Sequence, residues 1–295
     1  YAALAGMGRK EYEVKLLMVV LTGIVLSASD AHERWMKSVT EAHAMWKDGD
    51  AAKARAAFER ALQPAAELAR LGDPLVVPAT HSHLADLHVV TGRLDRAEWH
   101  ALEGLRQLEA VRDEAIEGKL RMSLGVAYFR TGREPAGESE FLRATALYRK
   151  SKKVDPSEVG LALVNIATVR LGQKRFGEAE NLFLEVVAIQ QAPGAQESAS
   201  LAFAHEGFGV LHLERHRYAE AERELSAALG IMLRLYGAQI PEIARMLDLH
   251  ALALSKLKRK KEAQAAFRQA REIREKMGPN WNASSISVHS LRSGK

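Results

Sequence analysis

Histidine is the residue type in this chain that most readily suggests metal chemistry, and the chain has 11 histidines. His212 and His216 lie four residues apart with Glu214 between them, a spacing that places two imidazoles on one face of a helix and can bind zinc. The intervening residues match neither helical zinc-protease motif. His81 and His88, in the densest histidine group, lie roughly 10 Å apart along a helix and cannot share one ion. We therefore predict no metal site and no cofactor.

Carboxylates and nucleophiles give no stronger indication of catalysis. Glu178 with Glu180, and Glu220 with Glu222, occupy positions that a helical pattern exposes to solvent. General acid-base catalysis needs a carboxyl whose pKa is shifted by burial or by a cleft. The chain has no cysteine, which excludes thiolate nucleophiles, thiolate zinc sites and disulfides. It also has no phosphate-binding glycine loop. We predict that the protein is not an enzyme.

Basic residues slightly outnumber acidic ones, and the formal net charge is +5. Two clusters, residues 149–153 and 256–261, concentrate lysine and arginine. Nucleic-acid recognition favours basic residues aligned along one face and interleaved with aromatic residues, whereas these clusters lie at separate turns and contain no aromatic residue. We expect solvated surface there, or a contact for an acidic partner or an anionic membrane, and no nucleic-acid binding.

The elements that position these residues repeat along the chain. Six segments align without internal gaps at intervals of 40 to 43 residues, and each carries a small residue in its second half. In most copies a second small residue precedes it by twelve positions and a bulky residue follows it by four. Small residues allow two antiparallel helices to approach closely, and the bulky residue fills the space between neighbouring units. The aligned small residues are Ala54, Ala97, Gly137, Ala179, Ala221 and Ala263.

This pattern resembles the tetratricopeptide repeat family, whose repeats have a small residue in the first helix, a turn, and then small and bulky positions across the second helix. The period of about 42 residues is longer than the family's ~34 and is similar to that of kinesin light chains, as are joints such as GAQIPEIA at residues 237–244. The resemblance covers about residues 35–277. It implies an all-α fold, an α-solenoid of about six helix-turn-helix repeats forming a right-handed superhelix.

The repeat pattern also predicts the domain boundaries and the turns. The array is expected over residues 32–280, and residues 281–295 are expected to form an end cap or a disordered tail. Residues other than glycine are strained at those turn positions that need a left-handed backbone. The repeats are predicted at about residues 35–68, 78–111, 118–151, 160–193, 202–235 and 244–277. The turn positions are Gly49, Gly92, Gly132, Lys174, His216 and Lys258.

In the tetratricopeptide family the inner face of the first helices lines a concave groove that holds a partner. The resemblance implies a clamp for a terminal carboxylate only where lysine, arginine and asparagine occupy this face, and here only Lys119 and Arg245 do so. The mostly apolar residues at the inner positions suit an amphipathic helix or an extended segment, although several could instead pack between the helices. In the second repeat Asp86 lies on the same face. The predicted groove consists of Lys119, Met122, Val126, Phe129, Leu161, Val164, Thr168, Leu171, Phe203, Glu206, Val210 and Leu213.

Residues 1–31 differ from the rest of the chain. Arg9, Lys10 and Lys15 precede an uncharged apolar run at residues 16–26, and small residues follow it. This order is typical of a secretory signal peptide. The run is shorter than the ~20 residues of a transmembrane helix, so we expect no stable membrane span. We expect an exported bacterial protein, periplasmic or secreted, whose start is either Tyr1 or Met7. If the segment instead packs on the first repeat, the protein would be cytoplasmic or membrane-associated.

These observations predict a non-enzymatic scaffold that binds a partner protein or peptide in the groove. One alternative is a membrane-tethered envelope assembly or secretion factor. A less favoured alternative is a ligand sensor or metal-binding protein with its site near His205, His212 and His216. The identity of the partner, the biological process and the oligomeric state do not follow from the sequence.

Overall fold

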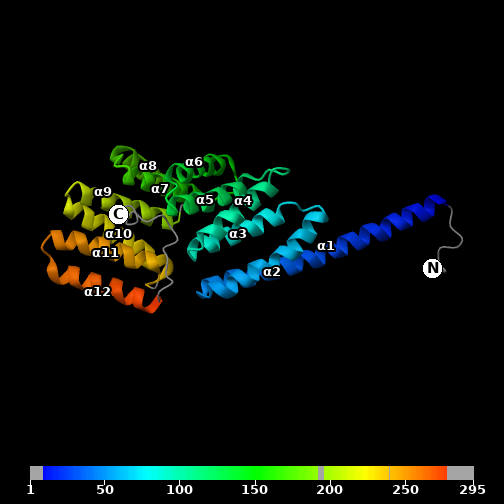
Figure 1. Ribbon diagram of the computed structural model, residues 1–295, viewed down its shortest axis with the longest axis horizontal. Helices are drawn as coiled ribbons and strands as arrows, with labels where there is room; N and C mark the ends of the chain where they lie inside the picture. The colour runs from blue at the N-terminus through cyan, green and yellow to red at the C-terminus, as the bar shows by residue number, and fades with distance from the viewer. Residues whose placement is uncertain (1–8, 192–195, 239, 278–295) are drawn as a thin grey trace. The chain divides into compact units, whose positions relative to one another are not determined.

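The computed structural model describes residues 9–191, 196–238 and 240–277, and it describes side chains from Ser27 to Lys276 within these ranges. Twelve helices and no strand occur there, and the helices follow one another as six pairs (Figure 1). The predicted all-α fold of about six repeats is therefore confirmed. The predicted tail, residues 281–295, lies outside the described residues. The helices are α1 (Arg9–Lys47), α2 (Ala51–Arg70), α3 (Val76–Val90), α4 (Leu94–Gln107), α5 (Glu114–Arg130), α6 (Glu134–Lys150), α7 (Pro156–Gly172), α8 (Phe176–Gln190), α9 (Ala199–Glu214), α10 (Tyr218–Tyr236), α11 (Pro241–Lys256) and α12 (Lys260–Met277).

Capping side chains determine where several helices begin. The carboxylate of Asp113 accepts hydrogen bonds from two backbone N–H groups in the first turn of α5, each at 3.0 Å. Asp155 accepts one from the backbone N–H of Ser157 at 2.8 Å, and Pro156 occupies the first helical position of α7. A cap of this kind stabilises a helix by about 0.5–2 kcal/mol, and proline is tolerated at that first position. The local sequence is therefore sufficient to start these helices.

The turn inside each repeat uses a left-handed residue in all six pairs, as the sequence predicts. The φ angles are 83° at Gly49, 72° at Gly92, 80° at Gly132, 60° at Lys174, 58° at His216 and 63° at Lys258. A side chain in this region brings its Cβ too close to the following carbonyl oxygen and costs roughly 1–2 kcal/mol. The last three turns are therefore strained and the first three are not.

Replacing Lys174 with glycine is expected to raise the melting temperature, because glycine adopts this positive φ without the Cβ contact. We expect a gain of about 0.5–1 kcal/mol after the added flexibility of the unfolded chain is counted. Gly132→Ala is the matched reverse change and should lower the melting temperature. No atom lies within 4 Å of the position its Cβ would take, so only the backbone is affected. Calorimetry that showed no gain for Lys174→Gly would contradict the strain.

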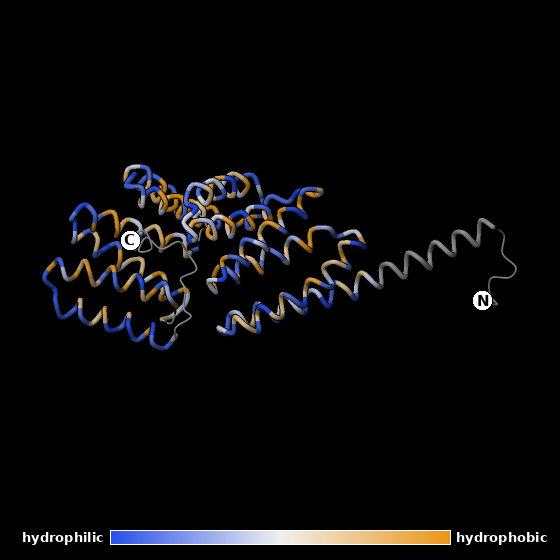
Figure 2. The backbone as a smooth tube through the Cα atoms, in the orientation of Figure 1, coloured by the Kyte–Doolittle hydropathy of each residue, from blue (hydrophilic) through white to orange (hydrophobic). Residues whose placement is uncertain are grey.

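Small residues bring the paired helices together where the register predicts them. A Cβ on Gly125 of α5 would lie 2.5 Å from the Phe141 ring, and one on Gly137 of α6 would lie 2.8 Å from the carbonyl oxygen of Gly125. The bulky position is fully buried in the other repeats but is 45% exposed at Phe267. Phe267 lies on α12, and the described chain has no later helix to cover it. Figure 2 shows α12 as largely hydrophilic, which fits a helix at the end of an array.

The chain forms two compact units. Unit 1 is the chain up to Leu84 together with Glu103–Arg112, and Ala31 of α1, Leu68 of α2 and Val76 of α3 lie in its core. Unit 2 is Ala85–Leu102 together with the chain from Asp113 onward. One of its apolar clusters surrounds Phe129 and Phe141, and a larger one extends from α7 to α12. In unit 2 the first helices contact one another in order, α7 with α9 and α9 with α11.

Helix α1 continues without a break through most of the segment predicted as a signal peptide. Among its described side chains, Ala31 is completely buried, and the indole N–H of Trp35 donates a hydrogen bond to the Thr80 hydroxyl at 2.9 Å. Within the described residues, no helix combines the length and the hydropathy needed to cross a membrane. Cleavage near residue 31 and export stay predictions.

Candidate functional site

The predicted groove residues fall into two classes. Nine are buried, and the apolar ones among them belong to the two clusters of unit 2. These nine side chains therefore lie in the core rather than along an open groove, where they fill the space between the helices. Partner binding by the twelve residues stays a prediction. Only Lys119, Met122 and Leu161 keep partly exposed surface. The buried nine are Val126, Phe129, Val164, Thr168, Leu171, Phe203, Glu206, Val210 and Leu213.

Glu206 of α9 belongs to a buried ion pair. Its carboxylate accepts a hydrogen bond from Arg245 of α11, and the two side chains are only 3% and 7% exposed. The guanidinium of Arg245 also lies 5.9 Å from the centroid of the Phe203 ring. Burial raises the pKa of Glu206, and the nearby Arg245 charge opposes that rise. The pair joins the fifth and sixth repeats and offers almost no surface to a partner.

The exposed residues of α5 adjoin an acidic residue of α3. Lys119 and Met122 are three residues apart and therefore share one face of α5. Asp86 is partly exposed, and its carboxylate accepts a hydrogen bond from the hydroxyl of Ser123 on α5. The Lys119 charge also acts on Asp86, although the described residues show no direct ion pair between the two. Acidic, basic and apolar side chains thus meet where α3 and α5 are joined.

Helix α7 extends this arrangement. Glu158 and Leu161 are three residues apart on α7 and share a face, and both are partly exposed. The Glu158 charge reaches Asp86 and the Tyr148 side chain of α6. Charge interactions and shared helix faces therefore connect partly exposed side chains of three successive first helices. We call this set the first-helix patch, and it consists of Asp86, Lys119, Met122, Glu158 and Leu161.

The Asp86 carboxyl has the most clearly perturbed protonation in this patch. Burial, as the largest cause, raises its pKa to about 6, while the Ser123 hydroxyl and the Lys119 charge lower it and the Glu158 charge raises it further. Because the folded pKa lies above the ordinary 3.8, the protonated form stabilises the fold. That contribution is complete below about pH 4 and is lost as the pH rises through about 6. A partly exposed carboxyl that is costly to ionise is a candidate binding group.

The histidines do not assemble a metal site within the described part of the chain, where no group of three histidine, aspartate or glutamate side chains could hold an ion. Helix α9 ends at Glu214, so His212 and His216 do not lie on one helix face. His216 occupies the left-handed turn, and its Nδ1 lies 3.0 Å from the Tyr218 hydroxyl. His205 Nδ1 lies 2.7 Å from a carboxylate oxygen of Glu224. The alternative of a metal site near these residues therefore has no supporting geometry.

Many of the exposed charges that the sequence singled out pair with one another across repeats. Glu180 of α8 pairs with Arg215 at 2.8 Å. Arg149, in the first basic cluster, pairs with Glu185, and Arg259, in the second, pairs with Glu222 of α10 at 3.3 Å. Exposed ion pairs contribute little stability, typically up to about 1 kcal/mol. Their arrangement fits a solvated surface better than a catalytic or nucleic-acid site.

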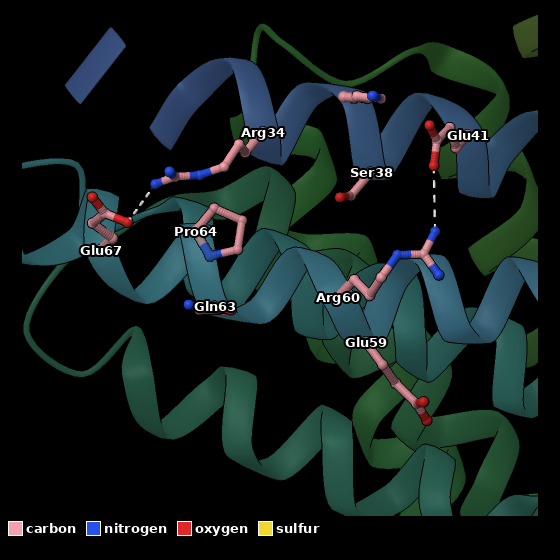
Figure 3. A pocket seen from close by; sticks show the side chains of 9 residues that line it. Arg34, Ser38, Glu41, Glu59, Arg60, Gln63, Pro64 and Glu67 are labelled. Atoms are coloured by element: carbon pink, nitrogen blue, oxygen red, sulfur yellow. Dashed lines mark hydrogen bonds and ion pairs between the residues drawn. The ribbon is translucent and has the colours of Figure 1, made fainter. Parts of the chain in front are cut away.

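A cleft of about 690 Å³ lies between α1 and α2 in unit 1 (Figure 3). Three basic and three acidic side chains line it, and ion pairs cross it between Arg34 and Glu67 at 2.6 Å and between Arg60 and Glu41 at 3.3 Å. Ser38 and Pro64 leave space between these two ion pairs. No motif or spacing in the sequence indicates this cleft. Balanced charges that already pair with one another give it no evident ligand.

Sequence reasoning found part of the first-helix patch. It selected Lys119, Met122 and Leu161 and placed Asp86 on the same face. It missed Ser123 and Glu158, because Ser123 lies outside the inner positions of the register and Glu158 precedes them. The signal that could have identified Glu158 is its spacing of three residues from Leu161, which predicts a shared face on any helix.

Comparisons with known proteins agree with this architecture. The sequence model described as "Tetratricopeptide repeat" matches residues 200–276, which run from the start of α9 almost to the end of α12. No curated protein matches the chain by sequence. The crystal structure of BtubC (BKLC) from P. vanneervenii is similar, with a TM-score of 0.59 and 23% identity, covering 79% of this chain and 95% of that one.

Two further solved structures share the fold at lower identity. The Rap conjugation gene regulator of plasmid pLS20, solved in complex with the Phr* peptide, has a TM-score of 0.60 and 11% identity, covering 86% of this chain and 75% of that one. PilF of Pseudomonas aeruginosa has a TM-score of 0.53 and 14% identity, covering 83% of this chain and 94% of that one. At these identities the likeness concerns the fold alone.

Proposed function

We propose that this chain, which has the tetratricopeptide repeat fold, is a non-enzymatic scaffold that holds a segment of a partner protein on the first-helix patch. The fold itself supports a protein-interaction role, since stacked repeats offer extended surfaces in place of an enclosed pocket. The location rests on the partial exposure of Met122 and Leu161, which also pack against the two apolar clusters of unit 2. The other apolar residues of the predicted groove are all buried.

The chemistry of the patch suits a peptide segment. Met122 is a flexible, polarizable side chain that adapts to different apolar partners, and Leu161 adds a second apolar contact on the next first helix. Asp86, Lys119 and Glu158 supply charges around these two side chains, as in interfaces that combine an apolar centre with a polar rim. The similar Rap regulator was solved with a peptide bound. A peptide-sized ligand is therefore a reasonable partner class for this fold.

Export and tethering remain separate proposals. If residues 1–31 are removed, the scaffold acts outside the cytoplasm. If they are retained, the array could instead organise an envelope assembly while attached to a membrane. N-terminal sequencing of the protein purified from its own cells distinguishes the two, because the first predicts a new terminus near residue 31 and the second predicts none.

Site-specific photo-crosslinking tests the proposed surface. A benzophenone amino acid at position 122 or position 161 of the full chain is expected to crosslink the same partner segment in cells, and mass spectrometry identifies that segment. Position 184 is the matched control, because Leu184 of α8 is 54% exposed but lies on a second helix. Met122→Glu should weaken capture of the identified partner by roughly tenfold or more, since losing a central contact commonly costs more than about 1 kcal/mol.

Two results would contradict the proposal. Crosslinks to one partner from position 184 but from neither 122 nor 161 would place binding on the second helices. Equal capture by Met122→Glu and the unmodified chain would remove Met122 from the interface. Melting curves of each variant accompany the capture, because Met122 also packs against the cluster around Phe129 and Phe141, and only variants that remain folded are compared.

A further inference from the structure

The first-helix patch has a charge imbalance that indicates the chemistry of its ligand. It contains two acidic residues, Asp86 and Glu158, and one basic residue, Lys119. We infer that the partner segment places an arginine or lysine side chain beside Asp86 and Glu158 and an apolar side chain against Met122 and Leu161. This inference rests on the proposed function, because it assigns a ligand class to the same patch.

The first argument is that the two acids of the patch have no ion-pair partner among the described residues. Three other carboxylates on the first helices of unit 2 have an arginine partner: Glu117 pairs with Arg121 at 2.7 Å, Glu206 with Arg245 and Asp248 with Arg274. Within the described residues, neither Asp86 nor Glu158 makes an ion pair. Asp86 has a single hydrogen bond, from Ser123, whereas an ionised carboxylate has about four acceptor positions. The patch therefore keeps unused acceptor capacity at a partly exposed position.

The second argument is that the Asp86 carboxylate is partly removed from water. Burial already removes much of the water that would solvate an ionised Asp86 carboxylate, and the unpaired Glu158 charge disfavours ionisation further. The charged or titratable groups that interact with Asp86 from the neighbouring helices are Lys119 of α5, Tyr148 of α6 and Glu158 of α7. Burial raises the pKa of Tyr148, which therefore stays neutral. A guanidinium or ammonium group from a partner would supply the compensating charge that these residues do not.

The apolar surface beside the acids is the third argument. Arginine and lysine carry long aliphatic stems that lie along apolar surface while the charged group reaches a polar partner. Met122 and Leu161 offer such a surface on α5 and α7, within the same patch as the two acids. A free metal ion would use the charges but not these apolar contacts. A basic residue next to an apolar one in a peptide uses both.

Binding of such a segment is linked to protonation. A cation at Asp86 favours the ionised carboxylate, so the pKa of Asp86 falls in the complex and a proton is released on binding at pH values near 6. The affinity should therefore increase as the pH rises from 5 to 7.5. The affinity for an apolar ligand without a basic residue should not increase in this way when the Asp86 carboxyl ionises.

A random 12-residue peptide library displayed on phage and selected on the full chain at pH 7.5 tests this inference. We expect selected peptides to carry arginine or lysine beside an apolar residue. For a histidine-free selected peptide, fluorescence anisotropy should show affinity roughly tenfold higher at pH 7.5 than at pH 5. Its arginine-to-citrulline analogue, which keeps the shape and removes the charge, should lose this gain. Asp86→Asn should likewise abolish the pH dependence, since asparagine does not titrate.

Glu185→Gln is the matched control, because it removes one acidic charge from α8 and leaves the patch intact. It should bind the peptide as the unmodified chain does. Peptides that need Met122 and Leu161 but lack a basic residue, or that bind equally at both pH values, would overturn the inference and leave the proposed function standing. Peptides whose binding ignores Met122→Glu, or a selection that yields none, would contradict the proposed function as well. Basic peptides that bind Asp86→Asn and Glu158→Gln undiminished would also overturn the inference.

Discussion

Arg245→Met is expected to destabilise the protein by about 3–5 kcal/mol, because Glu206 then remains buried without a compensating charge. Glu206 is 3% exposed, and the guanidinium of Arg245 is its hydrogen-bond partner across α9 and α11. Urea unfolding followed by circular dichroism measures the loss. The loss in the free energy of unfolding, relative to the unmodified chain, should be largest near pH 8 and smaller at pH 5. Burial already raises the pKa of Glu206, so its carboxyl can take up a proton and lose its charge as the pH falls.

The double variant Glu206→Met/Arg245→Met separates charge burial from packing. Two of the three guanidinium nitrogens of Arg245, Nε and Nη2, are buried without a hydrogen-bond partner in the described structure, which makes the pair incompletely satisfied. We expect the double variant to recover most of the lost stability and to equal or exceed the unmodified chain. A double variant as unstable as Arg245→Met would show that packing around Phe203, and not the lone charge, causes the loss.

Phe183→Ala is expected to cost about 3–5 kcal/mol, the usual range for removing a buried aromatic ring. Phe183 of α8 is fully buried, and its ring lies 5.5 Å from that of Phe208, centroid to centroid. A Cβ on Gly207 of α9 would lie 2.1 Å from the Phe183 ring, so the two helices close on a ring that only glycine accommodates. Calorimetry or urea unfolding measures the change. Leu184→Ala is the matched control, because Leu184 follows Phe183 in the sequence but is 54% exposed. This substitution should change the free energy of unfolding by less than about 0.5 kcal/mol.

The same contact predicts a coupling between the two positions. Gly207→Ala alone should destabilise by about 1–3 kcal/mol through overpacking. In the Phe183→Ala background the methyl group enters space that the ring has left, and alanine is a better helix former than glycine. Gly207→Ala should then be neutral or stabilising. Equal effects of Gly207→Ala in both backgrounds would mean that α8 and α9 separate freely, contrary to the packing described here.

Much of the fold could be predicted because the repeat signals are local. Gly132 and Lys174 occupy the same turn position, and a left-handed backbone is required there whichever residue is present. Gly125 and Gly137 marked the closest approach of two adjacent helices, which a short turn already holds together. Helix periodicity, capping and turn geometry act over fewer than about ten residues, and the order of residues encodes them directly.

The candidate site was less predictable because it depends on how closely successive repeats approach. The register placed Phe129, Phe203 and Leu161 on the same inner face, yet only Leu161 keeps partly exposed surface. A periodic pattern determines the face on which a side chain lies, but the spacing between neighbouring helices decides whether that face is open. Phe267 shows the converse case. It occupies a core position of the repeat but is exposed, because the described chain supplies no further helix beyond α12 to cover it.

The amino-acid sequence by itself determined the helical class, the number of repeats, the strained turns and the face of each first helix that turns inward. Only the tertiary structure decided which inner residues are core and which are surface. It also paired Asp86 with Ser123 and Glu206 with Arg245, residues separated by 37 and 39 positions. Burial and electrostatic pairing depend on distances between separate helices, and several different packings of one helical pattern can satisfy the same local rules.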